Sequence, residues 1–404
     1  MKILRIIPSM DPAQGGPCQG IRNSIPAQDD LGVYNEVVSF DAPEASFIEE
    51  DSFKIHALGP AKGPYSFCGR FASWLRENLH RFDIAIIHGL WQYSSYGAFR
   101  VWDELKKKGE QVPRLYVMPH GMLDPYFQRA RSRRLKAIRN WFFWKLIEGK
   151  VVNGADGILF TCEEELLLAR ETFRPYLPKA EMNVGYGIQK PPVFEEKFTV
   201  EFERKCPAVI DRPYWLFLSR IHPKKGVDLL IKAYLRLKEK FPKVPDLVIA
   251  GPGPETSFGQ NLQKLADGQS IHFPGMLTGA AKWGAFYGCT AFILPSHQEN
   301  FGIAVVEAMA CSKAVLVSDQ VNIWREIQEG GGGLICEDTE TSVYTMLEKW
   351  FLKSDETQAE MGSKAAMIFH SLYTIEKAAE KMVESLRDGS QIASFEPAEE
   401  AISK

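Results

Sequence analysis

A chain of 404 residues is longer than one hydrophobic core usually serves, so we expect two domains of similar size. The composition is 45% hydrophobic, 25% charged and 12% aromatic, which is ordinary for a globular protein, and a net charge of −3 argues against a nucleic-acid partner. The seven cysteines have no CxxC pair and no histidine at metal-binding spacing, which indicates free thiols in a reducing compartment. No apolar stretch approaches the roughly 20 residues of a membrane span. We therefore expect a cytoplasmic protein, either free or resting peripherally on the inner face of the cell membrane.

Short apolar runs alternate with longer amphipathic segments, a pattern typical of βα units around a parallel sheet. In the first half the predicted strands are residues 2–7, 35–40, 84–88, 115–119 and 157–161. The predicted helices of that half are residues 17–29, 67–79, 96–107 and 133–149. In the second half the predicted strands are residues 214–219, 247–250, 270–273, 291–294 and 314–317. The predicted helices there are residues 227–240, 260–266, 280–287, 303–311, 342–352 and 375–386. The predicted fold class is α/β, with two Rossmann-like β/α/β domains.

The boundary between the halves shows in the composition. Prolines and charged residues crowd residues 191–212, which favours neither helix nor strand, and we predict the interdomain linker there. The predicted domains are residues 1–190 and 213–371. The small, polar and acidic tail, residues 389–404, is predicted to be disordered. Ligands of such domains bind at the carboxyl ends of the strands, so we expect the site in a cleft that the two domains face.

Two carboxylates follow one of the predicted strands. Glu299 lies in the loop after residues 291–294, and Glu307 lies about one and a half turns into the next helix. Carboxylates so placed can accept hydrogen bonds from the hydroxyl groups of an elongated ligand. Between them, Asn300, Phe301 and Gly302 lead into a helix N-terminus, where unpaired N–H groups favour an anion or a hydroxyl oxygen. Helix capping by Glu299 and a solvated Glu307 remain the alternative interpretation.

This segment resembles the E-x7-E motif of glycosyltransferase family 4, whose members have the GT-B fold and use nucleotide sugars. The resemblance extends to Ser219–Gly226, in which Arg220 and Lys225 match the pair that holds the donor diphosphate. Arginine offers a rigid, planar pair of donors and lysine a compact charge, so these two residues suit a diphosphate even without the family resemblance. The resemblance implies that Glu299 orients the transferred hexose and that Glu307 holds the ribose. It also implies that the first domain receives the acceptor, that the second domain binds the nucleotide sugar, and that a helix at residues 373–388 packs back on the first domain.

Three further segments match the family. Gly15 and Gly16 follow the first strand, lack the G-x-G-x-x-G fingerprint, and correspond to the glycine pair beneath the donor. His120 begins the His-Gly turn that the family places beside the donor sugar and the reacting centre. Met276 and Leu277 occupy the loop that meets the base, although main-chain groups usually serve there. We accordingly predict catalytic roles for Glu299, Arg220, Lys225 and His120.

A basic segment with aromatic residues, Arg129–Lys145, lies in the first half of the chain. Its cations precede the run Trp141–Trp144 and comprise Arg129, Arg131, Arg133, Arg134, Lys136 and Arg139. Such a segment suits an anionic membrane surface, at about 1 kcal/mol per basic residue. A solvated helix that packs its aromatic rings into the core is the competing interpretation.

The resemblance implies a retaining hexosyltransferase that acts by front-face displacement. No D-x-D triplet occurs, and because two basic residues can do the work of a cation we predict metal independence with no cofactor. A UDP-glucose-like donor is favoured and GDP-mannose stays open, as does a nucleophilic role of Glu299. The expected acceptor is a saccharide or a lipid-linked saccharide in cell-surface polysaccharide synthesis. A sugar-nucleotide epimerase or phosphorylase of the GT-B fold and a non-catalytic binding module are the alternatives.

Overall fold

The computed structural model describes residues 1–130 and 134–388 and divides the chain into two compact units. Unit 1 comprises Met1–Gly187 together with the segment from Ile375 onward, and unit 2 comprises Ile188–Thr374. The predicted tail, residues 389–404, and the basic residues Arg131 and Arg133 lie outside the described part of the chain.

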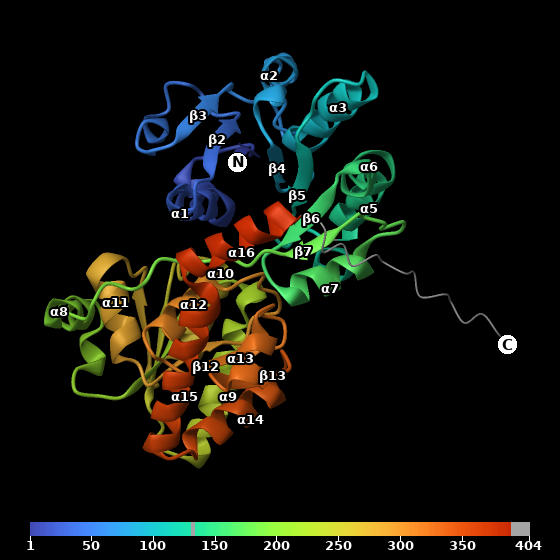
Figure 1. The fold of residues 1–404 in the computed structure, drawn as a ribbon. Coiled ribbons are helices and arrows are strands. Elements are labelled where there is room, and N and C mark those ends of the chain that lie inside the picture. Colours follow the sequence, from blue (N-terminus) through green and yellow to red (C-terminus); the bar gives the residue numbers. More distant parts are fainter. Residues whose placement is uncertain (131–133, 389–404) are drawn as a thin grey trace. The chain divides into compact units, whose positions relative to one another are not determined.

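Unit 1 is built on a seven-stranded parallel sheet of order β3-β2-β1-β4-β5-β6-β7 (Figure 1). Its strands are β1 (Lys2–Ile6), β2 (Tyr34–Ser39), β3 (Lys54–Ala57), β4 (Ile84–His88), β5 (Arg114–Met118), β6 (Gly157–Phe160) and β7 (Glu181–Asn183). Its α-helices are α1 (Gly16–Asp30), α2 (Phe71–Asn78), α3 (Tyr93–Lys107), α4 (Tyr126–Arg129), α5 (Arg134–Phe143), α6 (Gly149–Gly154), α7 (Glu163–Thr172) and α16 (Ile375–Asp388). The strand order reverses between β1 and β4, and this is where such sheets bind ligands.

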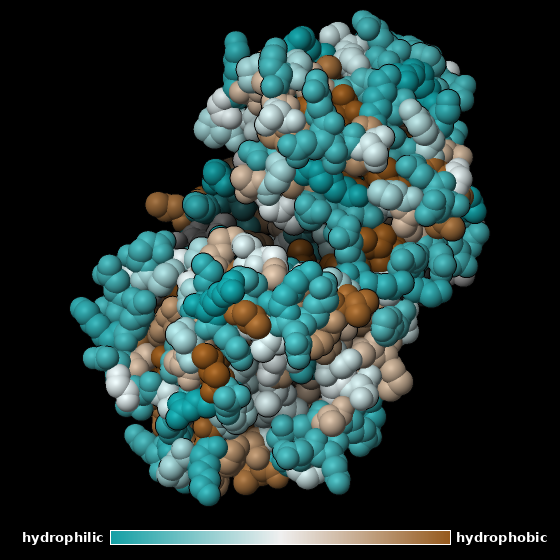
Figure 2. Space-filling model, turned by 90° about the vertical axis from the view of Figure 1, so that its left-hand side faces the viewer, coloured by the Kyte–Doolittle hydropathy of each residue, from teal (hydrophilic) through white to brown (hydrophobic). Residues whose placement is uncertain are grey.

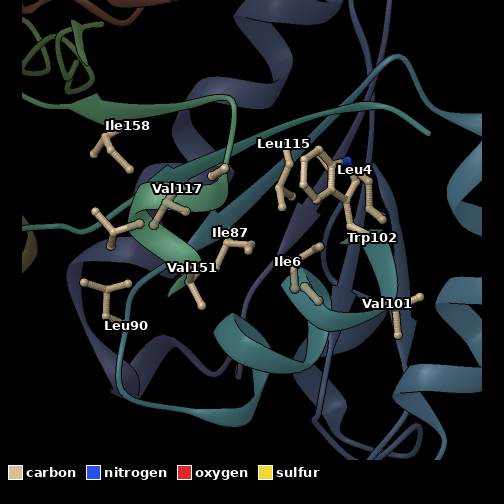
Figure 3. Packing of buried hydrophobic residues seen from close by; sticks show 14 of the residues in the cluster. Leu4, Ile6, Ile87, Leu90, Val101, Trp102, Leu115, Val117, Val151 and Ile158 are labelled. Atoms are coloured by element: carbon tan, nitrogen blue, oxygen red, sulfur yellow. The ribbon is translucent and has the colours of Figure 1, made fainter. Parts of the chain in front are cut away.

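Alternate residues of the central strands face opposite layers, as a strand covered on both sides requires. Leu4, Ile6 and Ile87 pack with Val101 and Trp102 of α3 and with residues of α6 (Figure 3). The other face, which includes Ile3, Ile84 and Ile86, is covered by α16 through Met382, Val383 and Leu386. The last helix therefore supplies part of the core of unit 1, and it also packs against α1.

Unit 2 is built on a six-stranded parallel sheet of order β10-β9-β8-β11-β12-β13. Its strands are β8 (Tyr214–Leu218), β9 (Asp246–Ala250), β10 (Ile271–Gly275), β11 (Ala291–Leu294), β12 (Val315–Ser318) and β13 (Gly333–Cys336). Its α-helices are α8 (Glu196–Lys205), α9 (Val227–Lys240), α10 (Ser257–Leu265), α11 (Gly279–Gly288), α12 (Ile303–Ala310), α13 (Trp324–Gly330), α14 (Glu340–Phe351) and α15 (Asp355–Ile368). Here the strand order reverses between β8 and β11. The predicted class of two Rossmann-like α/β domains is confirmed.

Two predictions about local structure are wrong. The predicted linker, residues 191–212, contains α8, which packs on α11 within unit 2 and buries Phe198 and Phe202. The prolines lie only beyond the two ends of this helix, where they interrupt no helical hydrogen bond. The predicted continuous helix 133–149 is instead α5, a π-helical turn η5 (Trp144–Glu148) and then α6.

The surface follows ordinary rules for a globular protein. On the face drawn in Figure 2, hydrophilic residues predominate and hydrophobic residues form small separate groups. All seven cysteines are free thiols, as predicted, and six of them are buried. In the described residues no helix is both long and apolar enough to cross a bilayer.

Candidate functional site

The loop after β8 carries the predicted diphosphate-binding residues. It leads through the short helix η7 (Pro223–Lys225) into α9, and Gly226 joins the two with a φ of 65°. A Cβ at Gly226 would lie 1.9 Å from the carbonyl oxygen of Pro295, so only glycine lets this loop lie against the loop after β11. The chain thus brings together two loops that are 70 residues apart in sequence but follow neighbouring strands.

Lys225 and Glu299 form an ion pair across these two loops. The Lys225 side chain is 8% exposed and that of Glu299 is 22% exposed, so the pair lies at the edge of the core. Arg220 is exposed and forms no ion pair within the part of the chain that the structure describes. Lys225 is predicted to hold a diphosphate and Glu299 a sugar, whereas here each is the ion-pair partner of the other.

The cations of this loop create a local positive field. The pKa of His222 is lowered, first by partial burial and then by the charges of Arg220, Lys224 and Lys225. Arg220 and Lys225 therefore act on the same small region, which is the electrostatic condition for binding a compact polyanion.

The backbone of Glu299 is clamped by the loop after β12. Its N–H donates to the carbonyl oxygen of Gln320 at 2.9 Å, and its own carbonyl accepts from the N–H of Asn322 at 2.9 Å. Asn322 also donates through its side chain to the Asn300 amide oxygen at 3.4 Å. The position of the Glu299 carboxylate is thus set by three consecutive strands of the sheet.

Glu307 lies on α12, which begins after Gly302 at a φ of 75°. Phe301 is buried and packs edge-to-face on Tyr373, with ring centroids 5.4 Å apart. The Glu307 carboxylate accepts from Lys282 Nζ of α11 at 2.8 Å. Lys282 was not predicted as a site residue, because nothing in its local sequence links it to a residue 25 positions away.

The predicted base-contacting loop follows β10. Met276 is 64% exposed and Leu277 is 5% exposed, so the first side chain is available to a ligand and the second belongs to the core. A ligand could therefore reach Leu277 only through its main chain, the kind of contact that the family resemblance implies for this loop.

In unit 1, Gly15 and Gly16 form the start of α1. Gly15 has a φ of 96° and caps the helix, both glycines are exposed, and a Cβ on either would meet nothing within 4 Å. The Gly16 carbonyl accepts from the Tyr186 hydroxyl at 3.1 Å. The space around this pair is consistent with close approach of a ligand to the backbone.

His120 stands at the end of a hydrogen-bonded chain that begins with a buried arginine. Arg5 Nη1 lies 3.4 Å from His88 Nε2, and His88 Nδ1 lies 2.9 Å from His120 Nε2. An arginine can only donate, so His88 Nε2 accepts and its Nδ1–H donates to His120 Nε2. The proton of neutral His120 is then on Nδ1, and this N–H is the donor that His120 can offer to a ligand.

Burial and charge both keep His120 neutral. Burial, and then the charge of Arg5, lowers its pKa to about 4, and the pKa of His88 is lowered well below its usual range by burial, His120 and Arg5. Arg5 is fixed by Asn35 at 3.1 Å and by Gln28 at 2.8 Å. This buried polar set was not predicted, because in the sequence Arg5 is a single charged residue within an apolar strand pattern.

The backbone at His120 is held in an uncommon conformation. His120 has a φ of 52° and Gly121 a φ of 78°, and the Gly121 N–H donates to Glu165 Oε1 at 2.5 Å. The other oxygen of buried Glu165 accepts from Thr161 N at 2.8 Å. Left-handed backbone at a non-glycine residue often accompanies a functional role. His120, His88, Arg5 and the first turns of α1 line a cavity of about 40 Å³.

The basic segment divides into buried and exposed parts. Trp144 is buried and stacks on Phe173, with centroids 4.7 Å apart, as the core-packing interpretation requires. Trp141 and Phe142 are 49% and 54% exposed, which that interpretation does not allow. Within residues 1–130 and 134–388, no group of three or more His, Cys, Asp or Glu side chains is placed to hold a metal ion.

Comparison with known proteins covers both halves of the chain. Residues 201–367 match the family described as glycosyl transferases group 1, and residues 15–182 match a glycosyl transferase 4-like domain. A trehalose synthase of Pyrococcus horikoshii is 31% identical over 184 residues, which is 44% of each chain. An N-acetylgalactosaminyltransferase of Campylobacter jejuni, named for a diphospho-undecaprenol substrate, is 25% identical over 46% of this chain and 47% of its own. These alignments thus span less than half of each relative's length.

The fold is shared with solved structures over nearly the whole chain. The HepE protein of Anabaena, solved with UDP and glucose, superposes with a TM-score of 0.67 and 16% identity over 96% of this chain and 99% of its own.

Proposed function

Since the chain belongs to the glycosyl transferases of group 1, we propose that it moves a hexose from a nucleotide-diphosphate sugar to an acceptor, with retention at the anomeric carbon. The observation that carries this proposal is the meeting of Arg220, Lys225 and Glu299 at the carboxyl ends of β8 and β11. These strands flank the point where the strand order reverses, which is where an open α/β sheet binds its ligand.

The cations would stabilise the leaving group. In the proposed step the bond between the anomeric carbon and the diphosphate oxygen breaks, and the electron pair stays with the diphosphate. The acceptor hydroxyl oxygen bonds to the same face of the anomeric carbon, and its proton passes to the leaving phosphate oxygen. Negative charge grows on the diphosphate as this occurs, and fixed cations such as Arg220 and Lys225 are most effective there.

The ion pairs give each carboxylate a defined role in the proposal. A diphosphate that reaches Lys225 would share its charge and leave Glu299 able to accept hydrogen bonds from the hexose. Lys282 would hold the Glu307 carboxylate in place for the ribose hydroxyls. Neutral His120 would donate its Nδ1–H on the side of the sugar.

We propose a UDP-hexose such as UDP-glucose as the favoured donor, with GDP-mannose as the second candidate. HepE, a protein of the same fold, was solved with UDP and glucose, which supports the choice of donor. We further propose that transfer needs no metal ion, because Arg220 and Lys225 supply two positive charges where a cation would otherwise act.

The acceptor is proposed to be a saccharide or a lipid-linked saccharide used in cell-surface polysaccharide synthesis. Contact with the inner face of the cell membrane is proposed for the basic segment Arg129–Lys145. Two features support it: Leu135 is 85% exposed and Leu146 is 64% exposed, and aromatic rings beside cations suit an anionic membrane surface. The Campylobacter relative is named for a substrate on a diphospho-undecaprenol, a lipid carrier.

Two alanine variants test the assignment of the two carboxylates. Glu299→Ala should abolish transfer from UDP-glucose while UDP affinity stays at least as high, because Lys225 is then freed for the diphosphate. Glu307→Ala should weaken UDP itself by losing the ribose contact. Glu329→Ala, on the exposed surface of α13, is the matched control and should change neither quantity.

Calorimetry with UDP and a transfer assay supply the readouts. If Glu307→Ala abolished transfer without weakening UDP, and Glu299→Ala weakened UDP, then Glu307 would contact the hexose and Glu299 the ribose. Turnover of UDP-glucose to an isomer, or only with inorganic phosphate, would establish the epimerase or phosphorylase instead. Binding of UDP-glucose without any turnover would indicate that the protein is a non-catalytic binding module.

A further inference from the structure

His297 connects three loops at the carboxyl ends of the strands of unit 2. It lies in the loop after β11, two residues before Glu299. Its main-chain N–H donates to the carbonyl oxygen of Lys224, in the loop after β8, at 2.8 Å. Its ring nitrogen Nδ1 lies 2.6 Å from Asp338 Oδ2, in the loop after β13. The proposed function gives this residue no role, although it contacts the loop of Lys225 and belongs to the loop of Glu299.

The residue before His297 shows how closely this part of the loop is held. Ser296 is fully buried, and its hydroxyl donates to the same carbonyl oxygen of Lys224 at 3.0 Å. The carbonyl oxygen of Ser296 accepts from the hydroxyl of Ser318, the last residue of β12, at 2.5 Å. These bonds join neutral groups and do not depend on pH. The ring of His297 adds a bond of a different kind, because it can carry a charge.

The strength of the bond between His297 and Asp338 depends on one proton. An ionised carboxylate can only accept, so Nδ1 of His297 carries the hydrogen. When the ring is protonated the bond is charge-assisted and stronger than the bond from a neutral ring. The His297 and Asp338 side chains are 31% and 34% exposed, so the ring can exchange its proton with solvent without any opening of the core. Among the described residues, Asp338 is the sole hydrogen-bond partner of the ring.

The surrounding carboxylates favour the protonated ring. The hydrogen bond to Asp338 raises the pKa of His297 above its ordinary 6.5, against the lowering by burial, and the charges of Asp338 and of Asp228 in α9 add to this rise. Burial, and also the charges of Asp338 and Glu337, raises the pKa of Asp319 in the loop after β12. Carboxylates from three elements therefore surround the bond. As pH rises through the raised pKa of His297, the ring loses its charge and the bond to Asp338 becomes a neutral one.

This bond matters most when a donor is bound. In the free protein the Glu299 carboxylate is paired with Lys225, which links its loop to the loop after β8. A diphosphate bound to Lys225 and to Lys224, the other lysine of that loop, would end this link. The loop of Glu299 would then keep its position through main-chain bonds and through the ring of His297.

We propose that His297 is a positioning residue of the donor site: its ring, bonded to Asp338, holds the loop that orients the Glu299 carboxylate toward the transferred hexose. The protonated ring holds this loop more firmly than the neutral ring, so transfer slows as the ring loses its proton. This inference rests on the proposed transferase function and adds to it a residue that acts through Glu299. The main-chain bond to Lys224 survives any substitution at this position, so the diphosphate end of the site should not change.

The test compares three side chains at position 297, with rates of transfer from UDP-glucose taken as ratios at each pH so that other titrations cancel. His297→Asn keeps a neutral donor near the position of Nδ1, and His297→Ala removes the donor. At about pH 6 wild type should be about fivefold faster than His297→Asn, the ratio for a charge-assisted against a neutral hydrogen bond, and at about pH 9 the two rates should be equal. His297→Ala should be slower than His297→Asn at every pH, and UDP affinity should stay within about twofold of wild type in both variants.

Two further variants complete the experiment. Asp338→Asn should move the decline of transfer to lower pH, because the charge that retains the ring proton is gone. His80→Asn makes the same substitution at an exposed histidine of unit 1, and its rate should match wild type at every pH. Thermal unfolding of each variant separates a loss of transfer from a loss of folded protein.

The outcomes separate this inference from the proposed function. Equal rates of His297→Asn and His297→Ala, or a ratio of wild type to His297→Asn that does not change with pH, would overturn the positioning role. A larger loss of UDP affinity than of transfer would also overturn it and would place His297 at the diphosphate.

A wild-type protein that binds UDP-glucose but transfers no hexose would reject the transferase. In that case the same order of variants in the affinity for UDP-glucose relative to UDP would support the positioning role, and equal relative affinities would reject it. Failure of the wild-type protein to bind UDP-glucose would reject both.

Discussion

Glu148 is predicted to make the stability of unit 1 depend on pH. Burial raises its pKa from 4.5 to about 7, against the lowering by hydrogen bonds from Ser95 and Trp91. Between these values the folded state keeps a proton that the unfolded state has lost, so stability falls as pH rises from about 4.5 to 7. At about 1.4 kcal/mol per pH unit, the full effect above pH 7 is about 3 kcal/mol.

Glu148→Gln imitates the protonated carboxyl. Its amide oxygen can accept from Trp91 N–H and its NH₂ can donate to Ser95 Oγ, so both contacts survive without a charge. The variant should match wild type at about pH 4.5 and exceed it by up to about 3 kcal/mol at about pH 8. That gain would raise the melting temperature of unit 1 by about 2–4 °C per kcal/mol.

Thermal unfolding of both proteins across this pH range is the assay. Glu163→Gln, an exposed carboxylate on α7, is the control and should show no pH-dependent difference from wild type. A constant difference between Glu148→Gln and wild type at all pH values would refute the buried, raised pKa. A variant less stable at every pH would show that the carboxylate is needed ionised.

Three further predictions concern the donor site, His120 and the basic segment. Arg220→Ala and Lys225→Ala should each weaken UDP binding about ten- to a hundredfold by calorimetry, with Lys232→Ala, an exposed lysine of α9, as the control. Unchanged affinity in both variants would remove Arg220 and Lys225 from the site. His88→Ala should lower transfer, whereas His88→Asn keeps a donor for His120 Nε2 and should restore transfer. Nitrogen NMR of His120 should show the Nδ1–H tautomer in wild type and in His88→Asn, and the same tautomer in His88→Ala would contradict the proposed chain of hydrogen-bond donors. A triple variant, in which Arg134, Lys136 and Lys145 are all changed to Glu, should not float with anionic vesicles. Wild-type binding to these vesicles should weaken as added salt shortens the Debye length to about 8 Å. Absence of flotation of the wild-type protein at low salt would exclude the membrane contact.

The central strands were predictable from sequence, whereas three of the four edge strands were not. Every predicted strand of the first half is present, and β4 and β11 have the predicted bounds. The missed strands β3, β7 and β13 all lie at a sheet edge, where one side is half-exposed and the sequence loses its continuous apolar run. Apolar runs therefore predicted the strands that both helical layers cover and, of the four edge strands, only β10.

Two helices, α15 and α8, were not predicted because their apolar pattern in the sequence is weak or obscured. α15 buries only Gly362, Ala365 and Ile368 along 14 residues, so its apolar stripe is too narrow to give a 3.6-residue period. Its signal was instead at the start, where Ser354 caps the helix by accepting from Thr357 N at 3.3 Å. α8 was hidden by flanking prolines, although Phe198 and Phe202 have helical spacing.

The positions of the site residues were predictable, but their partners were not. Arg220 and Glu299 each follow a predicted strand of unit 2, and the parallel sheet of that unit brings such positions to one edge; His120 follows a predicted strand of the separate sheet of unit 1. Lys282 and the chain from Arg5 through His88 depend on which strands and helices are neighbours, which a local pattern does not encode.

The ion pair between Lys225 and Glu299 follows from the same packing and changes how the proposed donor site works. A buried lysine without a counter-charge is costly, so in the absence of ligand Glu299 supplies the partner that the loop after β8 needs. A bound diphosphate would take over that task, and the carboxylate would then be released to the sugar that the diphosphate carries. A nucleoside diphosphate alone would free Glu299 without giving it a sugar to hold, so binding energy from the hexose and from the diphosphate should be coupled rather than additive. That coupling would discriminate an intact donor from its product, because only the donor satisfies both charges at once.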